Sequence, residues 1–299
     1  MNTNTNTIVN TTQEQFIDAL KSAGVFLAAD AHIIPDGQLH RARAADDKAG
    51  ALSIWYNLHL DTPASGVAGN WKTGARLTWC SKRQSALTAS ESAEIARRIT
   101  EDKRRAQEAT EARHKDAAAK AIRIWTDAAP ASPRHPYLER KGIALGIARQ
   151  SGASLVLPVV DFSGALHGLQ FIDAEGGKRF ISGMAKAGHF IPTGGDPDGT
   201  RPPWITEGHA TAATIQAMRP EVCTIAACDA GNLLSVATEA RRRWPSVSLV
   251  VCPDFDAIGR QKGQEAAEKA RAKILPPPER IPEGATDWND WANHRREVA

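Results

Sequence analysis

The hydrophobic and polar pattern of the first 89 residues predicts a small α+β module. Apolar positions recur at helical spacing within residues 13–23, which predicts a short amphipathic helix. Residues 53–60 and 76–79 are apolar runs typical of strands, and they lie between turn-forming Gly, Pro, Asp and Asn residues. The uncharged Asn- and Thr-rich leader, residues 1–12, is expected to be disordered. The module is therefore expected to span residues 13–89.

The pattern changes at residue 90 to one rich in Ala, Glu, Lys and Arg. Gly and Pro are absent from residues 90–128, which predicts one long helix or two, capped by Ser90 and ended by Pro130 and Pro133. Acidic and basic side chains alternate at helical spacing, which is typical of a solvated helix face with i,i+4 ion pairs rather than of a nucleic-acid grip. We interpret residues 90–150 as a charged helical segment and a connector.

Two further sequence patterns follow this segment, and together they predict an α/β architecture. Residues 154–192 alternate as strands do, with a hairpin turn at 175–177, so we expect a β-rich subdomain over residues 151–200. From residue 204 onward, short apolar runs alternate with helical segments, which predicts parallel strands with crossover helices. This last domain is expected to span residues 201–299.

Acidic residues follow the predicted strands of this last domain. Glu207 closes the first apolar run, Asp254 and Asp256 close the third, and Asp287 and Asp290 lie in a late segment. Ligands bind at the carboxyl ends of parallel strands, and converging carboxylates repel one another unless a cation lies between them. The spacing therefore predicts a site for a hard divalent metal. The competing interpretation is that these acids cap the helices that follow them.

Composition excludes several classes of protein. A chain of 299 residues has room for two or three domains, and its net charge of +3 is compatible with nucleic-acid binding without requiring it. The four cysteines form no CxxC pair, so a zinc ribbon or a disulfide framework is unsupported. The phosphate-binding pattern GxxxxGK[ST] is absent, which argues against a P-loop motor. Neither a signal peptide nor a membrane-length apolar run is found, so we expect a cytoplasmic protein without membrane contact.

The acidic pattern resembles the Toprim domain, which bacterial-type primases, topoisomerases and related nucleases share. Its hallmarks are a glutamate after the first strand, matched by Glu207, and a DxD after the third, matched by Asp254 and Asp256. Residues 257–260 (AIGR) look like the turn after DxD in primase-type members. Residues 286–290 (TDWND) are similar to a late acidic element of phage and plasmid primases.

The resemblance extends upstream of the acids. Residues 168–172, 178–180 and 188–190 look like the segment that precedes Toprim in plasmid and satellite-phage primases. Residues 36–56 and 69–71 resemble the N-terminal module fused to those proteins. His209 is a departure, because relatives often carry an aromatic or aliphatic residue there, and its role stays open at this point.

The resemblance implies a Toprim primase that makes short RNA primers on single-stranded DNA from nucleoside triphosphates during plasmid or phage replication. It implies a parallel sheet flanked by helices, Mg²⁺ or Mn²⁺ as cofactor, and a separate replicative helicase as partner. Glu207, Asp254 and Asp256 would be catalytic, and Asp287 and Asp290 would join them as metal ligands. Glu207 is equally compatible with a ligand or a general-base role. A Toprim nuclease and a non-catalytic, DNA-binding replication accessory protein are the alternatives.

Basic side chains are needed around such a site to contact nucleotide or nucleic acid. The candidates are Lys178, Arg179, Lys186, Arg260 and Lys262. Asp229 follows the second strand close to a glycine, and we expect it to initiate a turn.

Overall fold

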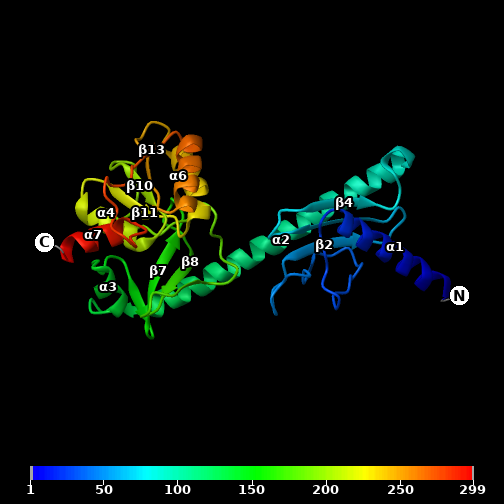
Figure 1. Ribbon diagram of the computed structural model, residues 1–299, viewed down its shortest axis with the longest axis horizontal. Coiled ribbons are helices and arrows are strands. Elements are labelled where there is room, and N and C mark those ends of the chain that lie inside the picture. Colours follow the sequence, from blue (N-terminus) through cyan, green and yellow to red (C-terminus); the bar gives the residue numbers. More distant parts are fainter. Residues whose placement is uncertain (1–2, 298–299) are drawn as a thin grey trace. The chain divides into compact units, whose positions relative to one another are not determined.

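The structure is a computed structural model that describes residues 3–297, and the chain divides into two compact units, Met1–Ala109 and Thr110–Ala299 (Figure 1). Each unit has its own apolar core. The boundary between the units lies within one long helix, α2 (Ala89–Asp127). The sequence predicts five segments, residues 1–12, 13–89, 90–150, 151–200 and 201–299, and these limits stay predictions.

The first unit packs a helix on a four-stranded antiparallel sheet of order β1-β2-β3-β4. Its elements are α1 (Thr3–Ser22), β1 (His40–Ala42), β2 (Ile54–His59), β3 (Ser65–Asn70), β4 (Arg76–Cys80) and the 3₁₀ turn η1 (Gln84–Ala86). Phe16 and Leu20 of α1 are fully buried against the sheet. The helix and both predicted strands of this module are therefore confirmed.

Helix α1 starts ten residues earlier than predicted, so the expectation of a disordered leader is wrong for residues 3–12, while Met1 and Asn2 lie outside the described residues. Once Phe16 and Leu20 anchor the helix, each further turn toward the N-terminus adds one hydrogen bond per residue without a new nucleation cost. The polar sequence of the leader gave no sign of this extension.

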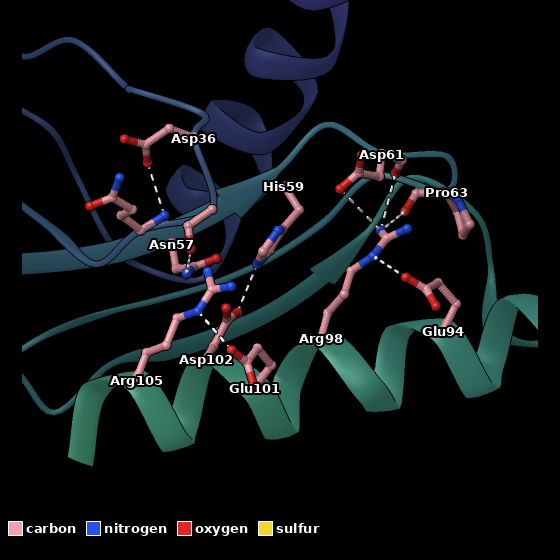
Figure 2. Close-up of polar contacts among 12 residues, drawn as sticks. Asp36, Asn57, His59, Asp61, Pro63, Glu94, Arg98, Glu101, Asp102 and Arg105 are labelled. Atoms are coloured by element: carbon pink, nitrogen blue, oxygen red, sulfur yellow. Dashed lines mark hydrogen bonds and ion pairs between the residues drawn. The ribbon is translucent and has the colours of Figure 1, made fainter. Parts of the chain in front are cut away.

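Helix α2 is one continuous helix, and polar contacts fix its first half to the sheet of the first unit. The side chain of Asp102 accepts a hydrogen bond from His59 Nε2 at 2.7 Å, and Arg98 donates to the carbonyls of Asp61 and Pro63 (Figure 2). Thr88, not Ser90, caps the helix: its Oγ1 accepts from Glu91 N. The exposed arginines pair with glutamates one turn away, as the solvated-face interpretation predicted.

The second unit begins with a five-stranded antiparallel sheet of order β5-β6-β7-β8-β9. Its elements are β5 (Ala129–Pro130), α3 (Pro136–Lys141), β6 (Arg149–Ser151), β7 (Ser154–Val160), β8 (Leu166–Ile172) and β9 (Lys178–Phe180). The hairpin turn predicted at 175–177 is confirmed, because Asp173 N donates to Gly177 O across it. Strands β7, β8 and β9 lie within the β-rich subdomain expected over residues 151–200, whereas β5 and most of β6 lie in the segment predicted as a connector.

A four-stranded, fully parallel sheet of order β11-β10-β12-β13 completes the second unit. Its elements are β10 (Pro203–Thr206), α4 (His209–Met218), β11 (Cys223–Ala226), η2 (Ala230–Asn232), α5 (Leu233–Arg243), β12 (Val250–Cys252), α6 (Ala257–Ala270), β13 (Lys273–Ile274) and α7 (Trp288–Glu297). The predicted parallel sheet with flanking helices is therefore confirmed.

Alternate residues of the central strands face opposite layers of helix. Ile205 and Val251 pack with α5 and α6 on one face. Val250 and Cys252 pack with Ile215 of α4 and with α7 on the other. Two isolated bridges, Val160–Phe190 and Ile191–Ala226, tie the antiparallel sheet to the parallel one. Among the described residues, no helix combines the length and apolar character that a bilayer crossing requires.

Candidate active site

Glu207 and Asp254 meet at the carboxyl edge of the parallel sheet. Strands β10 and β12 are hydrogen-bonded neighbours, with Thr206 paired to Cys252, so the residues that follow them emerge side by side. Oε1 of Glu207 accepts a hydrogen bond from the backbone N of Asp254 at 3.0 Å. The Glu207 residue is only 8% exposed. Two acids that lie 47 positions apart in the sequence therefore form one partly buried pair.

Gly259 makes room for this pair at the start of α6. A Cβ atom at this position would lie 2.6 Å from Oε1 of Glu207 and 3.0 Å from the carbonyl oxygen of Asp254. Real Cβ atoms essentially never approach other atoms at 2.6 Å. The helix can approach the carboxylate because residue 259 has no side chain. Gly259 belongs to residues 257–260 (AIGR), which resemble the turn after DxD in primase-type Toprim domains.

The buried charge of the pair is not neutralised by the protein alone. Burial raises the pKa of Asp254 to about 8, and Glu207 and Asp287 add to the rise. Burial also raises the pKa of Glu207, and the nearby carboxylates of Asp256, Asp229 and Asp287 contribute. Oδ1 of Asp254 is buried and accepts no hydrogen bond from any described residue. A carboxylate oxygen without a donor, beside other acids, fits the ligand set of a hard divalent cation.

Asp287 reaches the same cleft from the loop before α7. A backbone hydrogen bond of 2.7 Å from Phe255 N to Thr286 O joins this loop to the one that carries Asp254. Asp287 and Asp254 both line a cleft of about 210 Å³. Oδ1 of Asp287 also accepts from the backbone N of Asn289 and of Asp290, so this carboxylate caps α7 as well.

Two of the predicted acids are placed differently from Glu207 and Asp254. Asp256 is exposed, and its Oδ1 accepts from Gly259 N at 2.7 Å, so it caps α6. That cap starts α6 at residue 257, so residues 257–260, which the sequence presented as a turn, form the first turn of the helix. Asp290 lies outside the pair: it accepts a hydrogen bond from Lys141 Nζ at 2.9 Å and two from Thr286. Burial raises the pKa of Asp290, but Lys141 and Thr286 outweigh it and lower the net value.

The helix-capping interpretation therefore holds for Asp256 and Asp287 but not for the buried pair. Gly208, not Glu207, occupies the N-cap position of α4, without any side-chain cap. The acids also spread too widely to enclose a cation tightly. Among described residues, three His, Cys, Asp or Glu donors lie mutually within 4.8 Å at one place only, and it is not here. Mg²⁺ tolerates such a site because it usually keeps several water ligands.

Of the predicted basic residues, Lys178 lies closest to the acids. It lines the cleft with Asp254, and its Nζ would be 3.6 Å from a Cβ atom built on Gly208. Its positive charge opposes the rise in the pKa of Asp254. Arg179, its neighbour in β9, instead stacks on the ring of Phe171 at 4.4 Å.

The other three basic candidates have different surroundings. Lys186 is ion-paired with Asp229, which starts the turn η2 as predicted. Lys262 pairs with Glu265 one turn along α6, at 2.9 Å. Arg260 is exposed on the first turn of α6.

Sequence reasoning missed several residues that shape the cleft. Tyr137 of α3 is buried, lines the cleft and has a pKa raised to about 12 by burial and by Asp287. Asn289 is fully buried and donates to Lys141 O at 2.7 Å and to Thr214 Oγ1 at 2.8 Å, which fixes α7 against α3 and α4. The only sequence signal for Asn289 was its place between two aspartates.

His209, whose role the sequence left open, is a buried neutral histidine beside the cleft. Its Nδ1 lies 3.0 Å from Thr193 Oγ1, and its Nε2 is buried without a partner among the described residues. Burial, together with the charge of Lys178, lowers its pKa to about 4. The side chain therefore packs beneath the first turn of α4 in its neutral form.

Comparison with known proteins identifies the domain that carries these acids. Residues 204–297 match the family model of the Toprim domain. The last third of the chain, which carries Glu207 and Asp254, is therefore similar to the Toprim domain. Toprim is a metal-binding fold, which agrees with the uncompensated carboxylates of Glu207 and Asp254.

Two curated relatives extend the similarity beyond Toprim. Both are named DNA primase TraC, from Escherichia coli; they are 34% and 32% identical to this chain over 291 and 282 residues, or 89% of it. The resemblance to plasmid-type primases is thereby confirmed. The chain spans only 20% and 26% of the length of these relatives.

Two solved structures of primases align with part of this chain. The primase fragment of the bacteriophage T7 primase-helicase protein is 14% identical, with a TM-score of 0.42 over 54% of this chain and 71% of that one. The DnaG primase catalytic domain bound to ssDNA is 12% identical, with a TM-score of 0.41 over 62% of this chain and 80% of that one. Both TM-scores are below 0.5, so the similarity to primases rests on the match to the Toprim model and on the two TraC relatives.

Proposed function

We propose that this chain is the catalytic part of a DNA primase that synthesises short RNA primers on single-stranded DNA. The observation that carries the proposal is the buried, uncompensated pair of Glu207 and Asp254 at the carboxyl edge of the Toprim sheet. The names of the two TraC relatives support the reaction class. A separate replicative helicase as partner and a cytoplasmic location belong to the same proposal.

Asp254 and Glu207 would hold Mg²⁺ or Mn²⁺, with Asp287 and Asp256 at the margin of the site. The bound cation would neutralise the triphosphate and favour ionisation of the attacking hydroxyl. In primer extension, the 3′-hydroxyl of the primer attacks the α-phosphorus of a nucleoside triphosphate, and pyrophosphate leaves. Oε1 of Glu207 is engaged by Asp254 N, which leaves its second oxygen for the cation or for the hydroxyl proton.

Lys178 is the basic residue best placed to contact the phosphates. It is exposed, lines the same cleft as Asp254 and Asp287, and is joined there by Arg140 and Lys141 of α3. Lys141 already pairs with Asp290, and Arg140 donates to the carbonyl of Ala174. Lys178 therefore brings a positive charge toward the acids without a carboxylate partner among the described residues.

The test is primer synthesis on circular single-stranded DNA with labelled nucleotides and Mg²⁺ or Mn²⁺. Wild type is compared with Asp254→Asn and Glu207→Gln. The matched control is Glu265→Gln, which removes a carboxylate from α6 that pairs only with Lys262. We expect short labelled products from wild type and the control, and none from the two site variants.

Two other outcomes would replace the proposal. Template cleavage without nucleotide incorporation, lost in the same two variants, would identify a Toprim nuclease. Binding of single-stranded DNA without incorporation or cleavage, even with a replicative helicase added, would identify an accessory DNA-binding protein. The fold of each variant is checked by circular dichroism, so that loss of activity is not confused with unfolding.

A further inference from the structure

A second group of metal-ligating side chains lies outside the acidic cleft, in the antiparallel sheet. Asp161 directly follows strand β7, His167 lies in β8, and His189 lies in the loop before the parallel sheet. Each residue offers one ligand atom, and these atoms lie within 4.8 Å of one another. Within the described part of the chain, this is the one group of three that meets that distance.

The backbone holds the three residues in place. The β7–β8 hairpin brings Asp161 beside His167, and Asp161 N donates to Ala165 O across the turn. Val160 and Phe190 exchange two backbone hydrogen bonds of 2.9 and 3.0 Å, which places His189 next to the hairpin. The rings of Phe162 and Phe190 pack at 4.5 Å beneath this junction.

A buried asparagine fixes the loop of His189 from the other side. Oδ1 of Asn232 accepts from Gly188 N, and its Nδ2 donates to the carbonyls of Lys186 and His189 at 2.9 Å each. Asn232 is 2% exposed. The donor atoms are thus presented by a fixed backbone, as a metal site requires.

The hydrogen bonds around the group orient the ring of His189 and hold Asp161 beside His167. Nδ1 of His189 lies 2.9 Å from the carbonyl oxygen of Ala187, which can only accept, so Nδ1 carries the proton and Nε2 keeps its lone pair. A ring N–H bound to a backbone carbonyl is the usual way in which a metal-ligating histidine is oriented. Oδ1 of Asp161 accepts from Ser163 and Ala165, and Oδ2 accepts from His167 Nε2 at 2.9 Å. A bound cation would replace this last hydrogen bond and draw the same two side chains together.

The spacing is close to that of a metal site. The rings of His167 and His189 lie 4.1 Å apart. A tetrahedral ion with bonds of about 2.0–2.1 Å holds its ligand atoms about 3.3 Å from one another, so small side-chain rotations close the group. All three residues are half-buried, and a cavity of about 620 Å³ lined by Asp161 and His189 gives access from solvent.

We propose that Asp161, His167 and His189 bind a divalent transition metal such as Zn²⁺, with one coordination position open to the adjacent cavity. Two imidazoles and one carboxylate suit Zn²⁺ and Co²⁺, whereas Mg²⁺ prefers oxygen ligands only. This site is therefore chemically distinct from the acids at the edge of the parallel sheet. The cavity is lined by Arg242 and Arg243 and also by Glu239, which forms an ion pair with Arg242.

The test is metal binding by tag-free protein that has been treated with chelator and desalted. Co²⁺ is titrated and its visible absorption recorded, and Zn²⁺ affinity is then measured by competition with a chromogenic chelator. Loss of an outer-shell partner typically weakens metal binding about 10–100-fold, so loss of a ligand should cost at least ~100-fold. We expect one tightly bound ion in wild type and this loss in His167→Gln and in His189→Gln.

The controls separate this site from the acidic one and from adventitious binding. His32→Gln removes an exposed histidine outside the group, and the double variant Glu207→Gln/Asp254→Asn removes the acidic pair. Both should retain the ion, and millimolar Mg²⁺ should not displace it. Zn²⁺ should raise the thermal midpoint of wild type and not that of His189→Gln. Absence of binding by wild type, equal binding by the histidine variants, or loss only in the double acidic variant would overturn the proposal.

Discussion

Gly259→Ala is the substitution that most directly probes how the fold builds the acidic site. The added methyl group would lie 2.6 Å from Oε1 of Glu207, 3.0 Å from the carbonyl oxygen of Asp254 and 3.2 Å from Cβ of Asp254. Oε1 is the end of the Glu207 side chain, but it is buried and accepts from Asp254 N, and the other two atoms belong to the backbone and Cβ of Asp254. Either the Glu207 carboxylate or the first turn of α6 must move.

The expected effect on stability is small, because two contributions oppose each other. Alanine is favoured over glycine in a helix by about 0.8–1.0 kcal/mol, while an extra methyl group in a packed interior costs about 1–3 kcal/mol. The net loss is therefore about 1 kcal/mol. The effect on catalysis is larger, because a displacement of about 1 Å at a reacting group costs roughly 100-fold in rate.

Gly263→Ala on the same helix is the matched control. Its methyl group would meet Cβ of Pro253 at 2.6 Å and so overpacks α6 to a similar degree without touching a carboxylate. Primer synthesis and its dependence on Mg²⁺ concentration are measured for both variants, together with thermal melts. We expect similar melts and a much larger loss of activity for Gly259→Ala. Wild-type turnover and Mg²⁺ dependence in Gly259→Ala would refute the assigned role of Glu207.

Three further predictions concern charge and burial around the same cleft. Without metal, the folded protein should lose stability as the pH rises from about 4 toward 8. The reason is that the pKa of Asp254 is raised from 3.8 to about 8 in the folded state, so this carboxyl ionises first in the unfolded state. Thermal melts in chelator should show this dependence on pH, and Asp254→Asn should reduce it. Lys178→Ala should raise the KM for nucleoside triphosphates about tenfold, since one charge-assisted contact is worth ~1.5 kcal/mol or more. Arg179→Ala, which removes a residue stacked on Phe171, should leave that KM unchanged in the same steady-state assay. Asn289→Ala should lower the free energy of unfolding by about 1–2 kcal/mol in denaturant titration, because Thr214 Oγ1 loses its buried amide donor while Lys141 O keeps Asn293 Nδ2.

The sequence predicted the parallel sheet and its acidic edge because both depend on local patterns. A short apolar run, an acid and a helical segment recur, and strands joined by helices run parallel. Glu207 and Asp254 then had to emerge at the same edge of the sheet. The pattern could not distinguish a carboxylate that lies beside another acid from one that caps the helix following it. Asp256 belongs to the second kind, because its Oδ1 accepts from Gly259 N and caps α6.

Contacts between segments that no strand-and-helix repeat connects escaped prediction. Asp290 was assigned to the metal site, yet its partner Lys141 lies 149 residues earlier, on a short helix that the sequence marked only as a connector. The group formed by Asp161, His167 and His189 was invisible for a similar reason. His189 joins it through the Val160–Phe190 bridge, which no spacing rule predicts.

The acidic pair also shows why a cation and the fold support each other here. Glu207 and Asp254 are drawn together by a backbone hydrogen bond and by the close approach of Gly259, although burial and mutual repulsion raise the pKa of both carboxyls. Lys178, which lines the same cleft, is exposed to solvent and only partly offsets that repulsion. A proton or a metal ion must supply the rest. At neutral pH a divalent cation competes with that proton, so each ion bound should release protons from the pair and stabilise the loops that follow β10 and β12.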